Sequence, residues 1–544
     1  MNAHRSGASV IFAATLAASA LAQQTWVTVE EARFSGSDTA AGDLFGSAVA
    51  LDGVTLVAGA PHAGPNERGA AYVFTRVNGA WSQQAKLVAT IGPVASFDHF
   101  GGAVAIAGDV IVVGAPEAES GGIDRGAAYV FRRSGAVWNA EASLLWPLPA
   151  DNERFGASVC VADDTIAIGA PYRPGLGGLM GGVGVFTYAG TWSFRVRLSN
   201  AMWDDDDQLG RAVDIERLAT TSYRLAGGTL TIGAVIYEGS GAAWSQLTEL
   251  GSWDMQSVAL SHPNAVVGHP YIDGPGTPGG RAYAFRKTGS AFVLDPTLYS
   301  SDPAIGDRFA TSLALEGDVL VVGEPQDDTP GAIGRGKAQL MERTGSSWIA
   351  RASIRASDGA GHDEFGSAVA LAGAIVIVGA PRDDHAAGVD AGSVYALRIG
   401  SPSVTYCTAS APGSGCTPTM SGTGAPSASL ATPFSIAASN IDGQRNGLLF
   451  YGASGPLAAP WGTSAYLCVK SPFQRTALQS SGGSAGACDG ALTLDWSAFA
   501  TANPGALGQP FAAGDEFYAQ AWYRLPGTSN ATHLSDALAF VLLP

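Results

Sequence analysis

Residues 43–75 read DLFGSAVALDGVTLVAGAPHAGPNERGAAYVFT, and variants of this stretch recur along the first 400 residues. The Asp-x-Phe-Gly pattern that opens it returns in related forms, and the copies begin at Asp43, Asp98, Glu153, Asp207, Asp307 and Asp363. The interval between Leu209 and Phe309 has room for two copies, the second starting near Trp253 and Asp254. Seven copies at a nearly fixed period predict units that stack or surround an axis.

Each copy contains four strand-like runs, named A to D in chain order. In the first copy they cover residues 47–51, 55–58, 70–75 and 80–88. Asp52-Gly53 is a favoured tight-hairpin pair between A and B, and a proline after B ends that strand. No segment shows a sustained helical period. Four strands repeated seven times predict an all-β protein with a seven-bladed propeller.

The ends of the repeat array predict how the ring closes. Strand D carries an aromatic residue in six copies: Trp81, Trp138, Trp192, Trp244, Phe292 and Trp348. The seventh copy has a strand C at Ser393–Ile399 but no strand D after it, whereas Thr25–Val29, with Trp26, precedes the first copy. We expect this N-terminal strand to complete blade seven, which would remove an exposed sheet edge.

The recurring Asp-x-Phe-Gly, Gly-Ala-Pro and Gly-Ala-Ala-Tyr-Val-Phe motifs resemble the FG-GAP repeats of integrin alpha subunits and of many exported bacterial proteins. The resemblance covers about residues 26–399 and implies a seven-bladed propeller. Integrin-type copies often hold calcium in a loop between strands A and B. Here those links are short hairpins such as Asp52-Gly53, which cannot supply six to eight oxygens. We therefore expect an exported bacterial type that lacks the calcium loops and binds no metal or cofactor.

Export is also indicated by the first residues. Arg5, the apolar run over residues 8–18 and Ala20-Leu21-Ala22 predict a signal peptide over residues 1–22. No later stretch is apolar and long enough for a transmembrane anchor. The formal net charge of −17 disfavours nucleic acid and anionic membranes as partners. We expect a monomer that is secreted, extracellular or bound at the cell surface.

The repeat stops near residue 400. The propeller is expected over residues 23–399, a Ser/Gly/Pro-rich linker and the start of the C-terminal region over 400–429, and a disulfide-bonded β-sandwich-like domain over 430–544. Its four cysteines are Cys407, Cys416, Cys468 and Cys488. They allow three pairings, of which Cys407–Cys416 with Cys468–Cys488 closes the shortest loops and is favoured. Cys160 is expected to be a small core residue.

No catalytic constellation stands out. Gly482 to Gly486 fits the G-x-S-x-G pattern, but it lies in a glycine-serine loop with only His533 after it. Lys337 follows a glycine-rich loop, but Ala338 stands where a phosphate loop needs Ser or Thr. We expect a non-catalytic binding or scaffold protein. The alternative is a hydrolase or lyase with its site in the central funnel, which motifs do not reveal because each blade can supply one residue.

The B–C loops are the candidate binding surface, because long, variable loops on a rigid frame are where recognition usually occurs. The ligand-binding candidates are Asp327, Asp328, Asp383, Asp384 and His385. If these residues bind the partner, it docks over blades six, seven and one. We expect a protein or glycan, and the acidic loops favour a basic one. His62, His269 and His385 lie in or after the Gly-Ala-Pro slot and are expected to be exposed. The acidic residue that opens each copy is expected to cap a turn by accepting backbone N–H bonds, and the run Asp204–Asp207 is expected to be a solvated loop.

Overall fold

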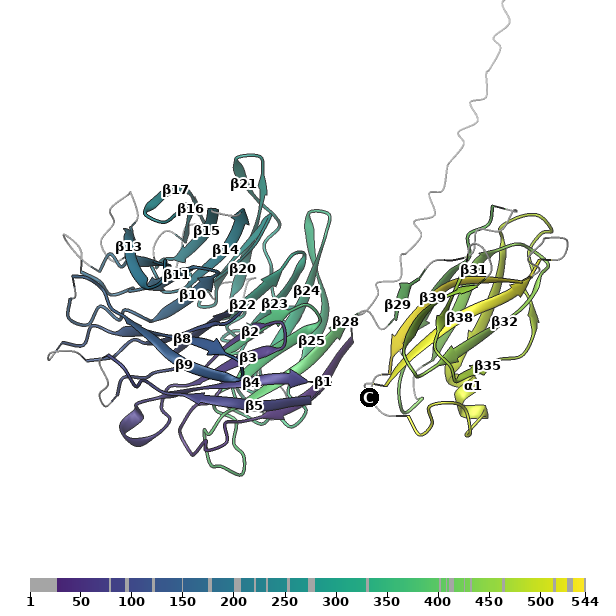
Figure 1. Cartoon of the computed structure of the whole chain (residues 1–544), viewed down its shortest axis with the longest axis horizontal. Helices are drawn as coiled ribbons and strands as arrows, with labels where there is room; N and C mark the ends of the chain where they lie inside the picture. The colour runs from purple at the N-terminus through teal and green to yellow at the C-terminus, as the bar shows by residue number, and fades with distance from the viewer. Residues whose placement is uncertain are drawn as a thin grey trace, which may run out of the picture.

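The computed structural model describes residues 27–542 except for short gaps, which fall at 78–79, 93–96, 120–122, 149, 175–178, 200–206, 220–221, 231–232, 252–254, 273–278, 329–331, 401–402, 408, 410–414, 425, 431–432, 462–464, 512–514 and 526–531. The predicted signal peptide, Trp26 and the acidic residues 204–206 lie outside the described residues. Figure 1 shows two bodies of strands, the first built from the repeats and the second from the C-terminal region. Among the residues described, no helix has the length and apolar character needed to cross a membrane.

Seven four-stranded antiparallel sheets form the first body, one for each copy of the repeat. Blades one to four, in the order A to D, contain β2 (Ala48–Asp52), β3 (Thr55–Ala60), β4 (Ala70–Val77) and β5 (Ala80–Leu87); β6 (Ala103–Ala107), β7 (Val110–Ala115), β8 (Ala127–Ser134) and β9 (Val137–Leu144); β10 (Ser158–Ala162), β11 (Thr165–Gly169), β12 (Val183–Tyr188) and β13 (Trp192–Leu198); and β14 (Val213–Ala219), β15 (Ser222–Gly228), β16 (Ala234–Ser240) and β17 (Ala243–Leu250). Blades five to seven contain β18 (Ser257–Ser261), β19 (Asn264–His269), β20 (Arg281–Thr288) and β21 (Ala291–Leu294); β22 (Ser312–Glu316), β23 (Val319–Glu324), β24 (Lys337–Thr344) and β25 (Ser347–Ile354); and β26 (Ala368–Ala372), β27 (Ile375–Ala380) and β28 (Ser393–Gly400), joined by the N-terminal β1 (Val27–Phe34).

Strand β1 closes the ring as predicted. It pairs antiparallel with β28, from Val27 opposite Gly400 to Phe34 opposite Val394. The sheet order β1-β28-β27-β26 makes it the outermost strand of blade seven, and Figure 1 shows β1 beside β28. Each strand A contacts the strand A of the next blade, and β26 contacts β2 across the closure. The A strands therefore surround the axis, and the propeller leaves no open end.

The repeated Phe-Gly pair joins neighbouring blades. The backbone N–H of Phe100 donates to the carbonyl of Arg68 in the B–C loop of blade one, and Gly101 donates to Gly114 within its own blade. A Cβ on Gly59 would lie 1.9 Å from the Gly101 carbonyl oxygen, so glycine is required where strand B meets the next blade. Met255 takes the phenylalanine position in blade five, where it is fully buried and donates to the carbonyl of Thr229. Because methionine replaces phenylalanine here, the fifth copy of the repeat could be recognised in the sequence only by its spacing.

The second body is a β-sandwich, as expected. One sheet has the order β29 (Ser403–Tyr406), β39 (Thr532–Val541), β38 (Glu516–Arg524), β32 (Asn446–Gly452) and β35 (Phe473–Arg475), with β36 (Gln479–Ser480) also pairing with β32. The other contains β30 (Thr419–Gly424), β31 (Phe434–Ile441) and β37 (Gly490–Asp495), and α1 (Trp496–Ala502) follows it. The buried Trp496 ring lies in the core between the sheets. A hairpin, β33 (Pro456–Trp461) with β34 (Ala465–Val469), completes the domain.

The favoured disulfide pairing is wrong. The bonds join Cys407 to Cys468 and Cys416 to Cys488. Both β29 and β34 lie against β39, and this contact brings Cys407, just after β29, to Cys468 on β34. Loop-closure entropy rises only slowly with loop length, so the shortest loops hold little advantage over pairings that strand packing selects. The fifth cysteine, Cys160, is free and buried, as expected.

Candidate functional site

The acidic residue that opens each copy of the repeat has the predicted structural role. A carboxylate oxygen of Asp43 accepts from the backbone N–H of Ala40 at 2.8 Å, and Asp307 accepts from Ala304 at 2.6 Å. Asp363 makes the same bond to Ala360. Burial raises the pKa of the Asp43, Asp307 and Asp363 carboxyl groups. In these three blades the acid holds the D–A connection by the same bond, which supports a structural role for the recurring acid.

The residue after each of these acids differs in every blade although its backbone conformation does not. The six described examples all have φ between +51° and +60°: Leu44, His99, Arg154, Gln208, Arg308 and Glu364. Left-handed backbone costs a residue other than glycine about 1 kcal/mol. Glycine would avoid this cost, but none of these six positions carries it. One fixed backbone geometry thus presents six different side chains.

A second set of varied residues follows the proline of the Gly-Ala-Pro slot. Its members are His62, Glu117, Tyr172, Tyr271, Gln326 and Arg382. These residues and the six after the acids belong to the D–A and B–C connections, which lie at one end of the strands. Because strand A is the innermost strand of each blade, both sets lie around the end of the axis. We name the twelve residues together the mouth ring.

Neighbouring members of the mouth ring contact each other across blade boundaries. In blades one to three, the His62 and His99 rings stack with centroids 5.0 Å apart, and His99 Nδ1 lies 3.1 Å from Glu117 Oε2. Arg154 Nη2 lies 3.3 Å from the other oxygen of Glu117. The Arg154 guanidinium also covers the Tyr172 ring at 5.2 Å.

The same arrangement continues in blades five to seven. The Arg308 guanidinium lies 5.4 Å from the Tyr271 ring centre. Gln326 Nε2 donates to Glu364 Oε1 at 2.8 Å, and Arg382 Nε lies 3.5 Å from Glu364 Oε2. Around the mouth ring, imidazoles, carboxylates, guanidinium groups and phenols are therefore held beside one another. The sequence indicated the B–C loops, which carry half of the mouth ring, but it did not single out the varied residues that follow the acids in the D–A connections.

The predicted B–C loop residues fall into two groups. Asp327 and Asp383 are buried and already paired: Asp327 with Lys337 and Arg355, each at 2.6 Å, and Asp383 with Arg33 at 2.5 Å. Asp328 and Asp384 are exposed and accept backbone N–H bonds from Gly334 and Asp390 of their own loops. His385 is half-buried, with Nε2 2.9 Å from the carbonyl oxygen of Gly392. Asp328 and Asp384 are thus the candidates that a partner can reach.

Blade six contains a buried polar cluster at a position that blade one fills with two alanines. Glu324 of strand B lies opposite Lys337 of strand C, a position held by Ala60 and Ala70 in blade one. Lys337 Nζ is fully buried, 2.6 Å from Asp327 and 3.2 Å from Glu324, and also contacts Asp302. Burial raises the pKa of Glu324 to about 8. Lys337 is therefore enclosed by the blade, which matches its interpretation as a structural residue.

Blade five has a comparable exchange at the same place. His269 lies opposite Arg281, again in the position of the alanine pair, and only 6% of its surface is exposed. The expectation that His269 is an exposed loop histidine is wrong, because it ends strand β19 instead of entering the loop.

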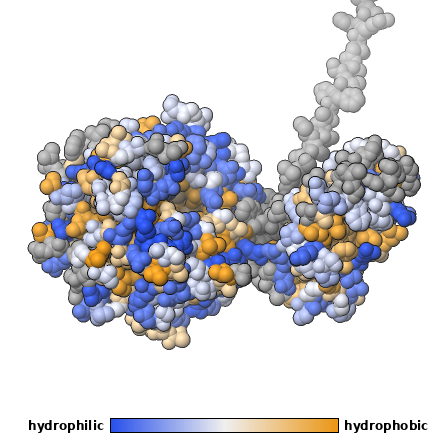
Figure 2. Space-filling model, viewed as in Figure 1, coloured by the Kyte–Doolittle hydropathy of each residue, from blue (hydrophilic) through white to orange (hydrophobic). Residues whose placement is uncertain are grey.

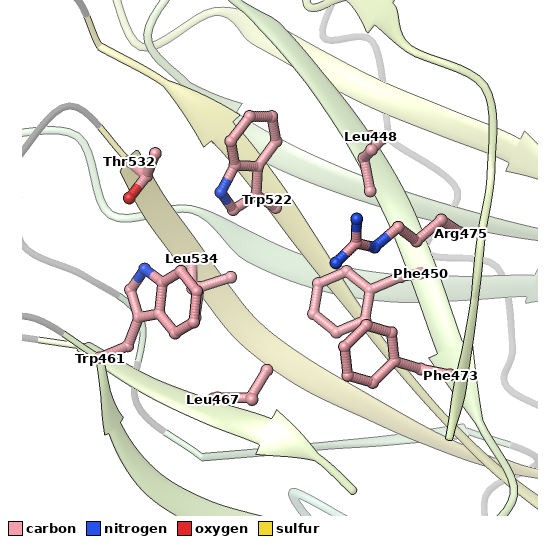
Figure 3. A pocket seen from close by; sticks show the side chains of 9 residues that line it. All are labelled: Leu448, Phe450, Trp461, Leu467, Phe473, Arg475, Trp522, Thr532 and Leu534. Atoms are coloured by element: carbon pink, nitrogen blue, oxygen red, sulfur yellow. The ribbon is translucent and has the colours of Figure 1, made fainter. Parts of the chain in front are cut away.

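The C-terminal domain carries a separate cavity on the outer face of its larger sheet. Its volume is about 370 Å³, near the lower end of the range for small-molecule sites. Figure 3 shows four aromatic rings around it, from Phe450, Trp461, Phe473 and Trp522. The Arg475 guanidinium covers the Phe473 ring at 5.6 Å and points inward. Apolar residues also reach the surface of this domain in the view of Figure 2.

Comparisons with known proteins identify the repeat. The FG-GAP repeat family model matches residues 28–74, 81–131, 294–341 and 348–397, so the chain carries FG-GAP repeats. Each matched segment begins near strand D of one blade and ends in strand C of the next, which is why the first segment starts in β1. A chain from the solved "Crystal Structure of Mitotic Checkpoint Complex" is similar at 11% identity and a TM-score of 0.44, covering 68% of this chain and 96% of that one. No curated protein matches the chain.

Proposed function

We propose that this FG-GAP repeat propeller is a secreted, non-catalytic binding or scaffold protein that recognises a protein or glycan partner through its mouth ring. The repeats and the propeller fold suggest a binding or scaffold role. The observation that carries the finer proposal is the contrast between a constant frame and varied side chains. Side chains that serve the frame recur, as the buried acids do in six of the seven blades, whereas the positions beside them carry six different residues. Loops of this kind on rigid scaffolds are common recognition surfaces.

Export is supported by the disulfides and by the N-terminal sequence. Two disulfides close loops in the C-terminal domain, and such bonds persist in oxidising compartments. Cleavage after Ala22 would leave Gln23 as the first residue, which N-terminal sequencing of the exported chain checks. The net charge and the exposed Asp328 and Asp384 favour a basic partner surface. Recovery of a chain that still begins at Met1 from the cell interior would contradict export.

The test of recognition is a binding screen against immobilised glycans and exported proteins, followed by affinity measurements on any binder. Arg154→Ala combined with Glu364→Ala alters the mouth ring on two sides. The matched control is Arg217→Ala, since Arg217 is an exposed arginine paired with Asp163 at the A–B hairpins of the opposite end. The mouth-ring variant should lose at least about tenfold in affinity, as expected for interface arginines. A loss of affinity in Arg217→Ala with no loss in the mouth-ring variant would show that the partner binds at the A–B hairpin end of the propeller instead.

A funnel enzyme remains the alternative, and one observation favours it. His62 and His99 lie together with Glu67 and Glu117, which are residue types that serve as general acids and bases. Hydrolase and lyase assays on ester and polysaccharide substrates, run with wild type and His99→Ala, separate the two functions. Turnover that disappears in His99→Ala would support the enzyme, and its absence from both proteins supports binding alone.

The cavity of the C-terminal domain is a second binding candidate. Arg475 makes no ion pair with any described carboxylate, although the chain is strongly acidic. A cation beside four aromatic rings suits a small ligand with an apolar body and one anionic group. Octanoate should quench the tryptophan fluorescence of the wild type more strongly than octanol does. Arg475→Gln should remove this difference, and equal quenching by both compounds in the wild type would contradict the anionic preference.

A further inference from the structure

Three side chains converge at the boundary between blades one and two. His62 and Glu67 belong to the B–C loop of blade one, and His99 to the D–A connection before blade two. One ring nitrogen of each histidine and one carboxylate oxygen of Glu67 lie within 4.8 Å of one another. Glu67 Oε2 is 3.1 Å from His99 Nε2 and 3.8 Å from His62 Nδ1. The three donor atoms are therefore close enough to share a single ion.

The spacing suits a tetrahedral metal. Nitrogen and oxygen ligands lie about 2.0–2.2 Å from zinc, so two ligand atoms of a tetrahedral site are separated by roughly 3.4 Å. The two measured distances fall on either side of this value. Two imidazoles and one carboxylate are typical ligands of late first-row divalent ions, whereas calcium prefers oxygen ligands alone.

A fourth residue holds one of the ligands in position. Nδ1 of His99 lies 3.1 Å from Glu117 Oε2, which leaves Nε2 directed toward Glu67. Histidines that bind metals almost always bond their second nitrogen to a carboxylate or carbonyl in this way. The backbone adds a further link, because the N–H of His99 donates to the carbonyl of Glu67 at 3.4 Å. Blade packing therefore preorganises the site.

We propose that His62, Glu67 and His99 bind a divalent transition-metal ion of the zinc type, with Glu117 as a positioning residue for His99. Three protein ligands leave one position of a tetrahedral ion for water or for a donor atom of a ligand. Sequence spacing did not indicate this site because its two histidines come from different blades. The site lies outside the A–B hairpins, so it is unrelated to the calcium loops of integrin-type repeats.

The test is a zinc titration of the purified chain without a histidine tag, in competition with a chromophoric chelator. The wild type should bind one Zn²⁺, and Co²⁺ in its place should give the visible absorption of a tetrahedral site. Glu117→Gln should weaken Zn²⁺ binding about tenfold, and His99→Ala by more than about 100-fold, since outer-shell changes alone cost 10–100-fold.

His385→Ala is the matched control, since His385 is a half-buried loop histidine of blade seven that lies outside the cluster. It should bind Zn²⁺ as the wild type does. His62→Ala provides a second variant at a more exposed position if His99→Ala fails to fold. No stoichiometric Zn²⁺ binding by the wild type, or equal binding by His62→Ala, His99→Ala and His385→Ala, would overturn the proposal and leave the cluster as a hydrogen-bonded surface group.

Discussion

Arg33, on the first strand of the propeller, donates from Nη2 to Asp383 in the B–C loop of blade seven at 2.5 Å, across 350 residues of sequence. Its other terminal nitrogen contacts Asp358 in the connection that leads into blade seven. The pair joins the first strand of the propeller to its last blade. Asp383 therefore stabilises the closure of the propeller ring, although its place in a B–C loop had made it a candidate for ligand binding.

Arg33→Ala should destabilise the propeller by about 2 kcal/mol, since it leaves the buried Asp383 carboxylate without its charged donor. Urea denaturation followed by intrinsic fluorescence measures the change. Arg217→Ala removes a pair whose side chains are both nearly half exposed, so its effect should stay below about 1 kcal/mol. Equal effects from the two substitutions would mean that the closure does not depend on Arg33.

Deletion of residues 23–34 should be far more damaging, because it removes the whole of β1 and exposes the edge of β28. Unpaired edges promote association between chains. We expect a truncated protein that aggregates or is cleaved rapidly by proteases, as size-exclusion chromatography and limited proteolysis would show. A monomeric product with unchanged melting would contradict closure by β1.

The cluster in blade six predicts a specific dependence on pH. The folded state raises the pKa of Glu324 to about 8 from an ordinary value of 4.5, chiefly through burial, so it holds this proton more tightly than the unfolded chain. Stability from this group is therefore lost as the pH rises from about 4.5 to 8. Glu324→Gln imitates the protonated side chain. It should match the wild type near pH 5 and exceed its urea midpoint at pH 9. A wild type that is the more stable protein at pH 9 would show that ionised Glu324 pairs with Lys337.

The disulfides predict both a connectivity and a stability effect. Peptide mapping of the unreduced protein should recover Cys407 with Cys468 and Cys416 with Cys488. Cys488→Ser with Cys416→Ser should destabilise the C-terminal domain by about 4 kcal/mol on the chain-entropy account, because the bond closes a loop between residues 72 apart. A peptide that links Cys407 to Cys416 would instead support the pairing expected from loop length.

Most of the fold could be predicted from the sequence because each copy of the repeat forms one blade. Regular spacing located six blades directly, and the missing strand D identified β1 as the closing strand. Met255 shows the limit of motif matching, since a buried methionine fills the phenylalanine position with few of the usual motif residues around it. The cysteine pairing could not be predicted, because the packing of β29 and β34 against β39 decides it and loop length does not.

The candidate site was harder to predict because it depends on contacts between blades. From the sequence, Asp327 was a candidate for ligand binding, but in the structure its carboxylate is already paired with Lys337 and Arg355. His62 and His99 are far apart in the sequence, and only the ring geometry stacks them. In a repeat protein, residues that recur in each copy indicate structural roles. Residues that vary inside a constant motif indicate a candidate recognition surface.

Recognition by the mouth ring can be tested by hydrogen–deuterium exchange of the chain with and without a binder from the screen. We expect slower exchange upon binding in peptides that cover residues 97–102, 153–157 and 363–366, which are D–A connections. Exchange at the A–B hairpins, such as Asp52-Gly53 and Gly317-Asp318, should not change. Protection confined to those hairpins, or to the C-terminal domain, would contradict recognition by the mouth ring.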